Sequence, residues 1–128
     1  MVLYKGSCHC GIIKFEVEAG EELTIIDCNC SICFKKGFQH LIVSKDKLKI
    51  NSDMELLSLY TFNTHIAKHY FCKKCGICPF YIPRSNPDGF DINYRCIDEP
   101  KPKKVVFEPY DGNNWEQQPS LAHLSASS

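Results

Sequence analysis

Apolar residues alternate with polar ones along much of the chain, a pattern of period two that is typical of strands with one buried face. The stretch IIKFEVE at 12–18 shows this alternation clearly. Runs rich in β-branched and aromatic residues predict further strands at 23–27, 38–43, 56–63, 66–71, 79–82, 90–94 and 104–107. The pattern therefore predicts an all-β fold with little helix.

Signals for helices and turns are few. Ser31 is a suitable cap for a single helical turn at 32–36, and Gly37 is suited to end that turn. Two of the predicted strands are separated by Asn63-Thr64-His65, which favours a turn and a paired arrangement. A longer loop, PRSNPDG, is rich in turn-forming residues and separates the strands at 79–82 and 90–94.

Length and composition indicate one domain. The chain has 128 residues, 44% of them hydrophobic and 23% charged, which is enough for a modest core and argues against disorder. No repeat or linker divides it, and the composition turns polar after about residue 111. We therefore expect a domain at 1–116 and a flexible C-terminal tail at 117–128.

Charge and hydropathy exclude several classes of partner. Fifteen basic residues balance fifteen acidic ones, so direct binding to nucleic acid is not expected, and the KPKK run at 101–104 is best explained as a solvated loop. No apolar run approaches the roughly 20 residues of a membrane span. The N-terminus lacks an apolar signal region, which favours the cytoplasm or the nucleus.

Nine cysteines occur at spacings of C-x-C and C-x-x-C. An odd number of cysteines in a reducing compartment favours metal half-sites over a disulfide framework, a redox motif or plain buried thiols. The cysteines fall into three groups: Cys8 with Cys10; Cys28, Cys30 and Cys33; and Cys72, Cys75 and Cys78, with Cys96 further on.

The first and third groups can each give two thiolates from one tight turn. A glycine follows Cys10 and another follows Cys75, and glycine tolerates the backbone angles that such turns need. Together Cys8, Cys10, Cys72 and Cys75 would complete a closed tetrahedral zinc site. That site would join the N-terminus to strands about 60 residues later and stabilise a small domain.

The middle group then has three ligands, Cys28, Cys30 and Cys33, for a metal that usually takes four. Catalytic zinc sites typically keep three protein ligands and leave the fourth position to water or substrate. We therefore expect a second, catalytic-type zinc that is open to a thiol, giving two zinc ions per chain. Lys35 and Lys36 follow directly and are candidates to bind the carboxylates of an anionic substrate.

Alternatives stay open at this point. Cys78 is a candidate fourth ligand, in which case both zinc sites would be structural, and Cys96 is most simply a small buried hydrophobe. The run C-x-x-C-x-x-C-P from Cys72 also resembles an iron–sulfur motif, but Ile82 stands where its next cysteine would fall.

Polar residues outside the cysteine groups give weaker signals. His69 lies three residues before Cys72 and is either a catalytic proton shuttle or an ordinary hydrogen-bonded histidine. Arg84, in the long polar loop, is a candidate substrate-binding residue. His9 is expected to point outward, and His40 and His123 carry no functional signal in the sequence.

The ordered motifs CHCG, DCNCSIC, FCKKCG, PRSNPDGF and RCID resemble those of the glutathione-dependent formaldehyde-activating enzyme family, across about residues 4–115. The stretches DCNCSIC, YTFNTH, FCKKCG and FYIPRSNPDGF are most similar to its centromere protein V branch. The resemblance implies a β-tent fold of coiled antiparallel sheets, a structural zinc on Cys8, Cys10, Cys72 and Cys75, and a catalytic-type zinc on Cys28, Cys30 and Cys33. Cys78 departs from the family pattern.

Two functions follow from these observations. The family's reaction joins formaldehyde to the thiol of glutathione, giving S-hydroxymethylglutathione, and is classed as a carbon–sulfur lyase reaction. The partners would then be a small thiol such as glutathione and a small aldehyde. The centromere protein V branch implies the alternative, a non-catalytic zinc domain that acts through protein or chromatin partners, since a fold persists while its function changes.

Overall fold

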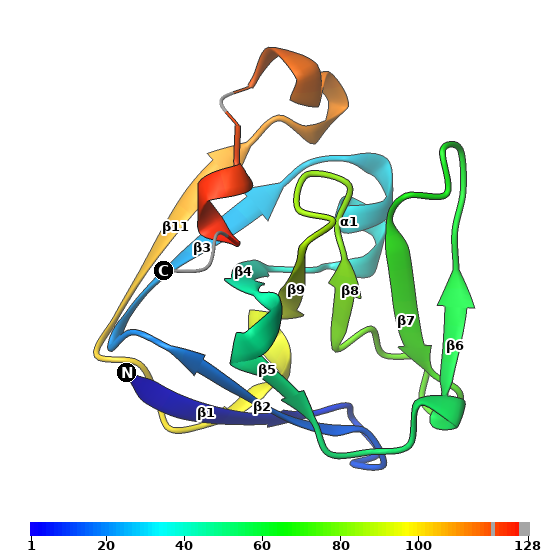
Figure 1. The fold of residues 1–128 in the computed structure, drawn as a ribbon, viewed down its shortest axis with the longest axis vertical. Coiled ribbons are helices and arrows are strands. Elements are labelled where there is room, and N and C mark those ends of the chain that lie inside the picture. Colours follow the sequence, from blue (N-terminus) through cyan, green and yellow to red (C-terminus); the bar gives the residue numbers. More distant parts are fainter. Residues whose placement is uncertain (119, 126–128) are drawn as a thin grey trace.

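Two β-sheets form the framework of this computed structural model, in which residues 1–118 and 120–125 are described (Figure 1). The smaller sheet has four strands, in the order β10 (Ile97–Glu99), β1 (Val2–Ser7), β2 (Lys14–Ala19) and β5 (Leu48–Ile50). The larger sheet has seven, in the order β11 (Lys104–Tyr110), β3 (Glu22–Cys28), β4 (His40–Ser44), β9 (Gly89–Asn93), β8 (Phe80–Ile82), β7 (Lys68–Cys72) and β6 (Leu57–Tyr60).

Helical structure is limited among the described residues. One α-helix, α1 (Ser31–Lys36), connects β3 to β4. Five short 3₁₀ segments complete the connections: η1 (Lys45–Lys47), η2 (Met54–Leu56), η3 (Tyr94–Cys96), η4 (Gly112–Gln117) and η5 (Ala122–Leu124). The prediction of a mostly-β fold with little helix is confirmed. None of the helices in the described part of the chain is long and apolar enough to cross a membrane.

Each predicted strand region contains a strand, but three strands escaped the sequence analysis. β5 and β10 have only three residues each, too few to show a period. In β1 the buried positions are Tyr4 and Gly6, and a glycine gives no apolar signal. A side chain at Gly6 would lie 2.2 Å from the ring of Phe15 on the neighbouring strand β2, so this close approach requires glycine.

One pairing departs from the antiparallel sheets that the resemblance implied. β11 runs parallel to β3, with Lys104 opposite Glu22 and Tyr110 opposite Cys28. The chain returns from β10, in the smaller sheet, to the start of β3, where Lys103 donates a backbone hydrogen bond to Glu21. Since both strands then run the same way, residues after Tyr110 emerge beside the first cysteine of the middle group.

The core lies between the two sheets. Phe15 of β2 meets Phe80 of β8 edge to face, with ring centroids 5.9 Å apart, and both side chains are buried. The remaining buried apolar side chains of this cluster come from both sheets and include Tyr4, Ile13, Val17, Ile25 and Ile92.

The predicted tail, 117–128, falls partly outside the described residues, which omit 119 and 126–128. Within it, Ser125 is buried, and its hydroxyl donates to Asp88 at 2.7 Å. The side-chain amide of Asn86 donates to the carbonyl of Leu121 at 2.8 Å and to the hydroxyl of Ser125 at 2.9 Å. This part of the segment therefore packs against the 83–88 loop.

Candidate metal centres and the adjoining cavity

The first cysteine cluster joins the turn after β1 to the turn after β7. The sulfurs of Cys8, Cys10, Cys72 and Cys75 all lie within 4.8 Å of one another. The Sγ of Cys10 is 3.6 Å from that of Cys8 and 3.6 Å from that of Cys72. The four residues that the sequence assigned to one site are thus brought together across the two sheets.

The two turns have matching backbone geometry. The amide of Gly11 donates to the carbonyl of Cys8 at 3.1 Å, and the amide of Gly76 donates to the carbonyl of Cys72 at 2.9 Å. Both glycines have positive φ, +83° and +77°, which side chains disfavour. The glycines that follow Cys10 and Cys75 are therefore needed for the turns that present the sulfurs.

The donor set fits zinc. Backbone amides of Ile13 and Cys75 each donate to a cluster sulfur at 3.4 Å. Tetrahedral ligands at the usual Zn–S distance of about 2.3 Å stand about 3.8 Å apart. The observed sulfur separations are close to this value.

The second cluster gathers around α1. Cys28 ends β3, Cys30 is the N-cap residue of the helix, and Cys33 is buried on it. The prediction of Ser31 as cap was wrong by one residue, and Cys30 makes no side-chain capping bond. Gly37 ends the helix in the left-handed conformation, with φ of +66°, as expected.

The three sulfurs of this cluster are hydrogen-bonded to one another. Donation from the Cys28 and Cys33 thiols lowers the pKa of Cys30 to about 2. Hydrogen bonds from Cys33 to Cys28, foremost, and to Cys30 raise the pKa of Cys33 well above its usual range. Without a metal, one thiolate is therefore held by two thiols, and a divalent cation can replace their protons.

His40 on β4 forms a possible metal group with Cys28 and Cys33, and Cys30 is not a member of that group. One of its ring nitrogens lies within 4.8 Å of the sulfurs of Cys28 and Cys33. Sequence reasoning missed this residue. The available signal was its position inside the apolar run FQHLIV, where a histidine is buried and needs a partner.

A cavity of about 570 Å³ adjoins the second cluster. Two of the residues proposed from the sequence, His69 and Arg84, line it together with the three cysteines. The other lining residues come from α1, from the 62–67 connection, from β8 and the loop after it, and from the end of β11 and the segment that follows. They include Ser31, Phe62, Asn63, Thr64, Tyr81, Tyr110, Asn113 and Asn114.

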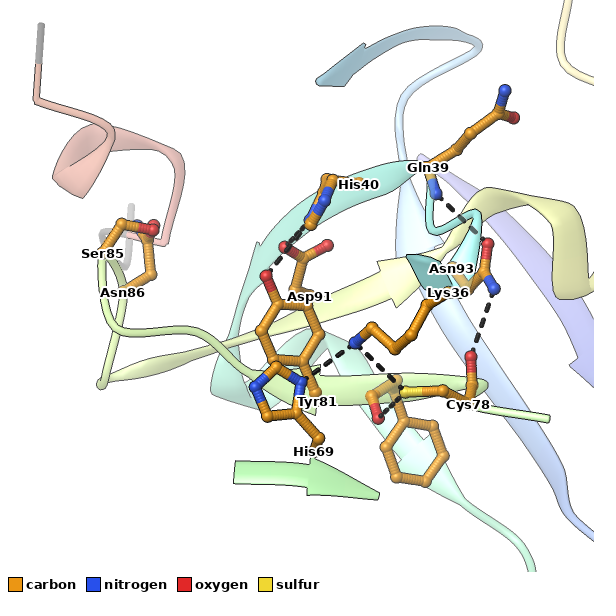
Figure 2. Close-up of polar contacts among 11 residues, drawn as sticks. Lys36, Gln39, His40, His69, Cys78, Tyr81, Ser85, Asn86, Asp91 and Asn93 are labelled. Atoms are coloured by element: carbon orange, nitrogen blue, oxygen red, sulfur yellow. Dashed lines mark hydrogen bonds and ion pairs between the residues drawn. The ribbon is translucent and has the colours of Figure 1, made fainter. Parts of the chain in front are cut away.

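His69 is buried and held in one tautomer (Figure 2). Its Nδ1 accepts a hydrogen bond from the ammonium of Lys36 at 2.9 Å, so in the neutral ring Nε2 carries the proton. Burial, with the nearby charge of Lys36, lowers the pKa of His69 to about 4. The ring stacks on Tyr81, at a centroid distance of 4.7 Å. His69 is therefore a neutral hydrogen-bond donor at physiological pH.

The two predicted lysines lie elsewhere. The Lys36 ammonium is 3.6 Å from the sulfur of Cys78 and 4.2 Å from the ring centroid of Tyr81 (Figure 2). Lys35 is exposed on α1. Neither lysine is among the described residues that line the cavity.

Cys78 and Cys96 lie outside both metal groups found among the described residues. The Cys78 thiol donates to the carbonyl of Phe80 at 3.5 Å, and burial raises its pKa to about 11. Cys96 packs in the main core, where burial raises its pKa to about 12. Both residues are in environments that favour the neutral thiol over a metal-binding thiolate.

Gly112 covers the second cluster from the segment after β11. A side-chain carbon at this position would lie 2.4 Å from the sulfur of Cys28. The segment is held in place by backbone donation from Asn29 to Tyr110 at 3.2 Å and by the amide of Asn113, which donates to the Asn29 carbonyl at 3.3 Å. No pattern in the sequence linked Gly112 to the cysteines.

These features define a β-sheet protein with two sites suited to thiolate-bound metal, one of them beside a cavity. Residues 3–112 match the sequence model of the glutathione-dependent formaldehyde-activating enzyme family, and the chain belongs to that family. A crystal structure of a Rhodobacter sphaeroides protein is similar, at 33% identity with a TM-score of 0.68. The similarity covers 81% of this chain and 99% of that protein.

Proposed function

We propose that the protein condenses glutathione with formaldehyde at the second cysteine cluster to give S-hydroxymethylglutathione. The observation that carries this proposal is the cavity in which Cys28, Cys30 and Cys33 meet His69 and Arg84. Membership of a family described by this activity supports the choice of substrates.

Zinc is the cofactor that the donor sets fit best, at two ions per chain. Cys8, Cys10, Cys72 and Cys75 would hold the first as a structural ion. Cys28, Cys30 and Cys33 would hold the second and leave one coordination position beyond the three thiolates. When bound there, zinc supplies a Lewis acid that lowers the pKa of a thiol to neutral values.

The cavity would bind the body of glutathione. Its volume of about 570 Å³ lies within the range of small-molecule pockets, about 300–1,000 Å³. Arg84 would orient a substrate carboxylate, because its planar guanidinium makes paired hydrogen bonds to that group. Lys35 would add positive charge at the exposed face of α1, whereas Lys36 would act by fixing the tautomer of His69.

The reaction forms one carbon–sulfur bond and breaks the π bond of the aldehyde. The thiol proton is lost as the sulfur attacks carbon, and the aldehyde oxygen gains a proton to become the new hydroxyl. His69 would donate a hydrogen bond from Nε2 to this oxygen as its negative charge develops. A neutral imidazole suits the role because its Nε2 keeps a proton at pH 7.

Exchange NMR on a mixture of glutathione, formaldehyde and the zinc-loaded protein tests the proposal. The rate of interconversion between free glutathione and S-hydroxymethylglutathione should rise in proportion to protein concentration. Cys30→Ser should abolish the acceleration, and His69→Asn should reduce it about 100-fold, as expected for the loss of a transition-state donor. Cys96→Ala, which changes a buried thiol outside both metal groups, is the matched control.

A non-catalytic zinc domain of the centromere protein V type is the alternative. Placement in that branch stays a prediction from the DCNCSIC, YTFNTH, FCKKCG and FYIPRSNPDGF stretches. An unaltered exchange rate in protein shown to carry two zinc ions would favour this alternative over catalysis.

A further inference from the structure

We propose that His40 supplies a fourth protein ligand to the second metal site, through Nε2. The inference rests on the metal that the proposed function places at Cys28, Cys30 and Cys33, but it does not depend on turnover. The three cysteines leave one coordination position of the metal open, and we assign this position to a residue of the chain itself.

The first observation is an unpaired nitrogen beside two sulfurs. His40 is buried, with 3% of its surface exposed, and a ring nitrogen lies within 4.8 Å of the sulfurs of Cys28 and Cys33. Among the described residues, His40 Nε2 is one of three buried side-chain nitrogen or oxygen atoms that lack a hydrogen-bond partner. Leaving such an atom unpaired is costly, and metal coordination removes the cost.

The second observation is the partner of the other ring nitrogen. Nδ1 of His40 lies 2.5 Å from a carboxylate oxygen of Asp91, which is also buried, and 3.3 Å from the hydroxyl of Tyr81 (Figure 2). A carboxylate only accepts, so Nδ1 carries the proton and the lone pair of the neutral ring lies on Nε2. Histidines that bind metals commonly donate their second nitrogen to a carboxylate in this way.

The strand order explains how these groups come together. β4 lies between β3, which ends at Cys28, and β9, which carries Asp91. The His40 ring is further fixed by Phe38, at a centroid distance of 4.8 Å, and by Tyr81 at 5.8 Å. The ring is therefore held in place by two aromatic neighbours as well as by Asp91.

The position of His40 sets a condition on substrate binding. The three cysteines line the cavity, whereas His40 is not among the described residues that do so. A thiol in the cavity would therefore meet the cysteines without lining up against His40. It must either displace the imidazole or add as a further ligand, so removal of His40 should strengthen thiol binding at the metal.

NMR of the full chain loaded with ¹¹³Cd and labelled with ¹⁵N tests the assignment directly. One cadmium resonance should show scalar coupling to a single imidazole, and the other should show none. His40→Asn keeps a donor for Asp91 but lacks Nε2, so the coupling should vanish. His69→Asn is the matched control, because His69 also has a buried, unpaired Nε2 but lies outside both metal groups, and its coupling pattern should be unchanged.

Chelator competition adds a second readout. Asp91→Asn should weaken metal binding at the second site by about 10–100-fold and leave the first site unchanged. Wild-type protein in which neither cadmium ion couples to an imidazole overturns the inference without any variant, even if glutathione exchange is accelerated. Conversely, an intact coupling without acceleration would refute the proposed function and leave this inference standing.

Discussion

Loss of one ligand should have different consequences at the two proposed metal centres. Cys72→Ser removes a buried sulfur that joins the end of β7 to the turn after β1, and so removes a link between the two sheets. Cys30→Ser removes a sulfur from a cluster whose other members lie on β3, α1 and β4, elements that follow one another along the chain. We expect Cys72→Ser to unfold the domain and Cys30→Ser to leave it folded with one zinc ion.

The expected losses of stability depend on the length of the loop that each metal closes between its ligands. Cys10 and Cys72 are 62 residues apart, and a covalent cross-link of that length removes about 4 kcal/mol of unfolded-state entropy. The second cluster closes at most the segment from Cys28 to His40, for which the same relation gives about 3 kcal/mol. Structural zinc binding contributes about 10–16 kcal/mol in zinc-finger peptides, which rivals the whole stability of a domain, about 5–15 kcal/mol.

Circular dichroism melts and zinc counts on the purified variants provide the assay. A loss of about 4 kcal/mol from the long closure alone lowers Tm by roughly 10–30 °C, at about 2–8 °C per kcal/mol. Cys72→Ser should therefore show no cooperative melt, or one at least this much lower. If Cys30→Ser melts as low as Cys72→Ser, the second metal is structural and the reasoning that separates the two centres is wrong.

Three further outcomes are expected. Gly112→Ala should reduce metal affinity at the second site in chelator titrations, because its side chain would press on Cys28, whereas Gly20→Ala, with no contact shorter than 3.4 Å, should not. Burial lowers the pKa of His69 from 6.5 to about 4, so between these pH values the unfolded chain binds a proton at His69 and the folded chain does not. The free energy of unfolding should therefore fall as the pH falls from about 6.5 to about 4. Between pH 7 and pH 4.5 the Tm of the wild type should fall further than the Tm of His69→Asn. Equal decreases in Tm would contradict this prediction. Arg84→Gln should raise the KM for glutathione about tenfold with little change in kcat, and an unchanged KM would exclude the carboxylate contact.

Much of the architecture could be predicted because it depends on local sequence patterns. The strand at 12–18 and the paired strands around Asn63-Thr64-His65 appeared as β2 and the β6–β7 pair. The glycines after Cys10 and Cys75 predicted turns, and both turns show the positive φ angles that glycine supplies. Such features depend on residues within a few positions of one another, so the sequence alone carries them.

The sequence by itself determined which cysteines group together, because ligands from one turn need fixed short spacings. It did not determine what completes the second group. His40 reaches Cys28 because β4 pairs between β3 and β9, and Gly112 reaches it because β11 pairs in parallel with β3. Strand order and direction depend on how the two sheets pack around a shared core, a sum of many weak contacts between distant residues. Only the tertiary structure could therefore place an imidazole, a carboxylate and a glycine around the three sulfurs.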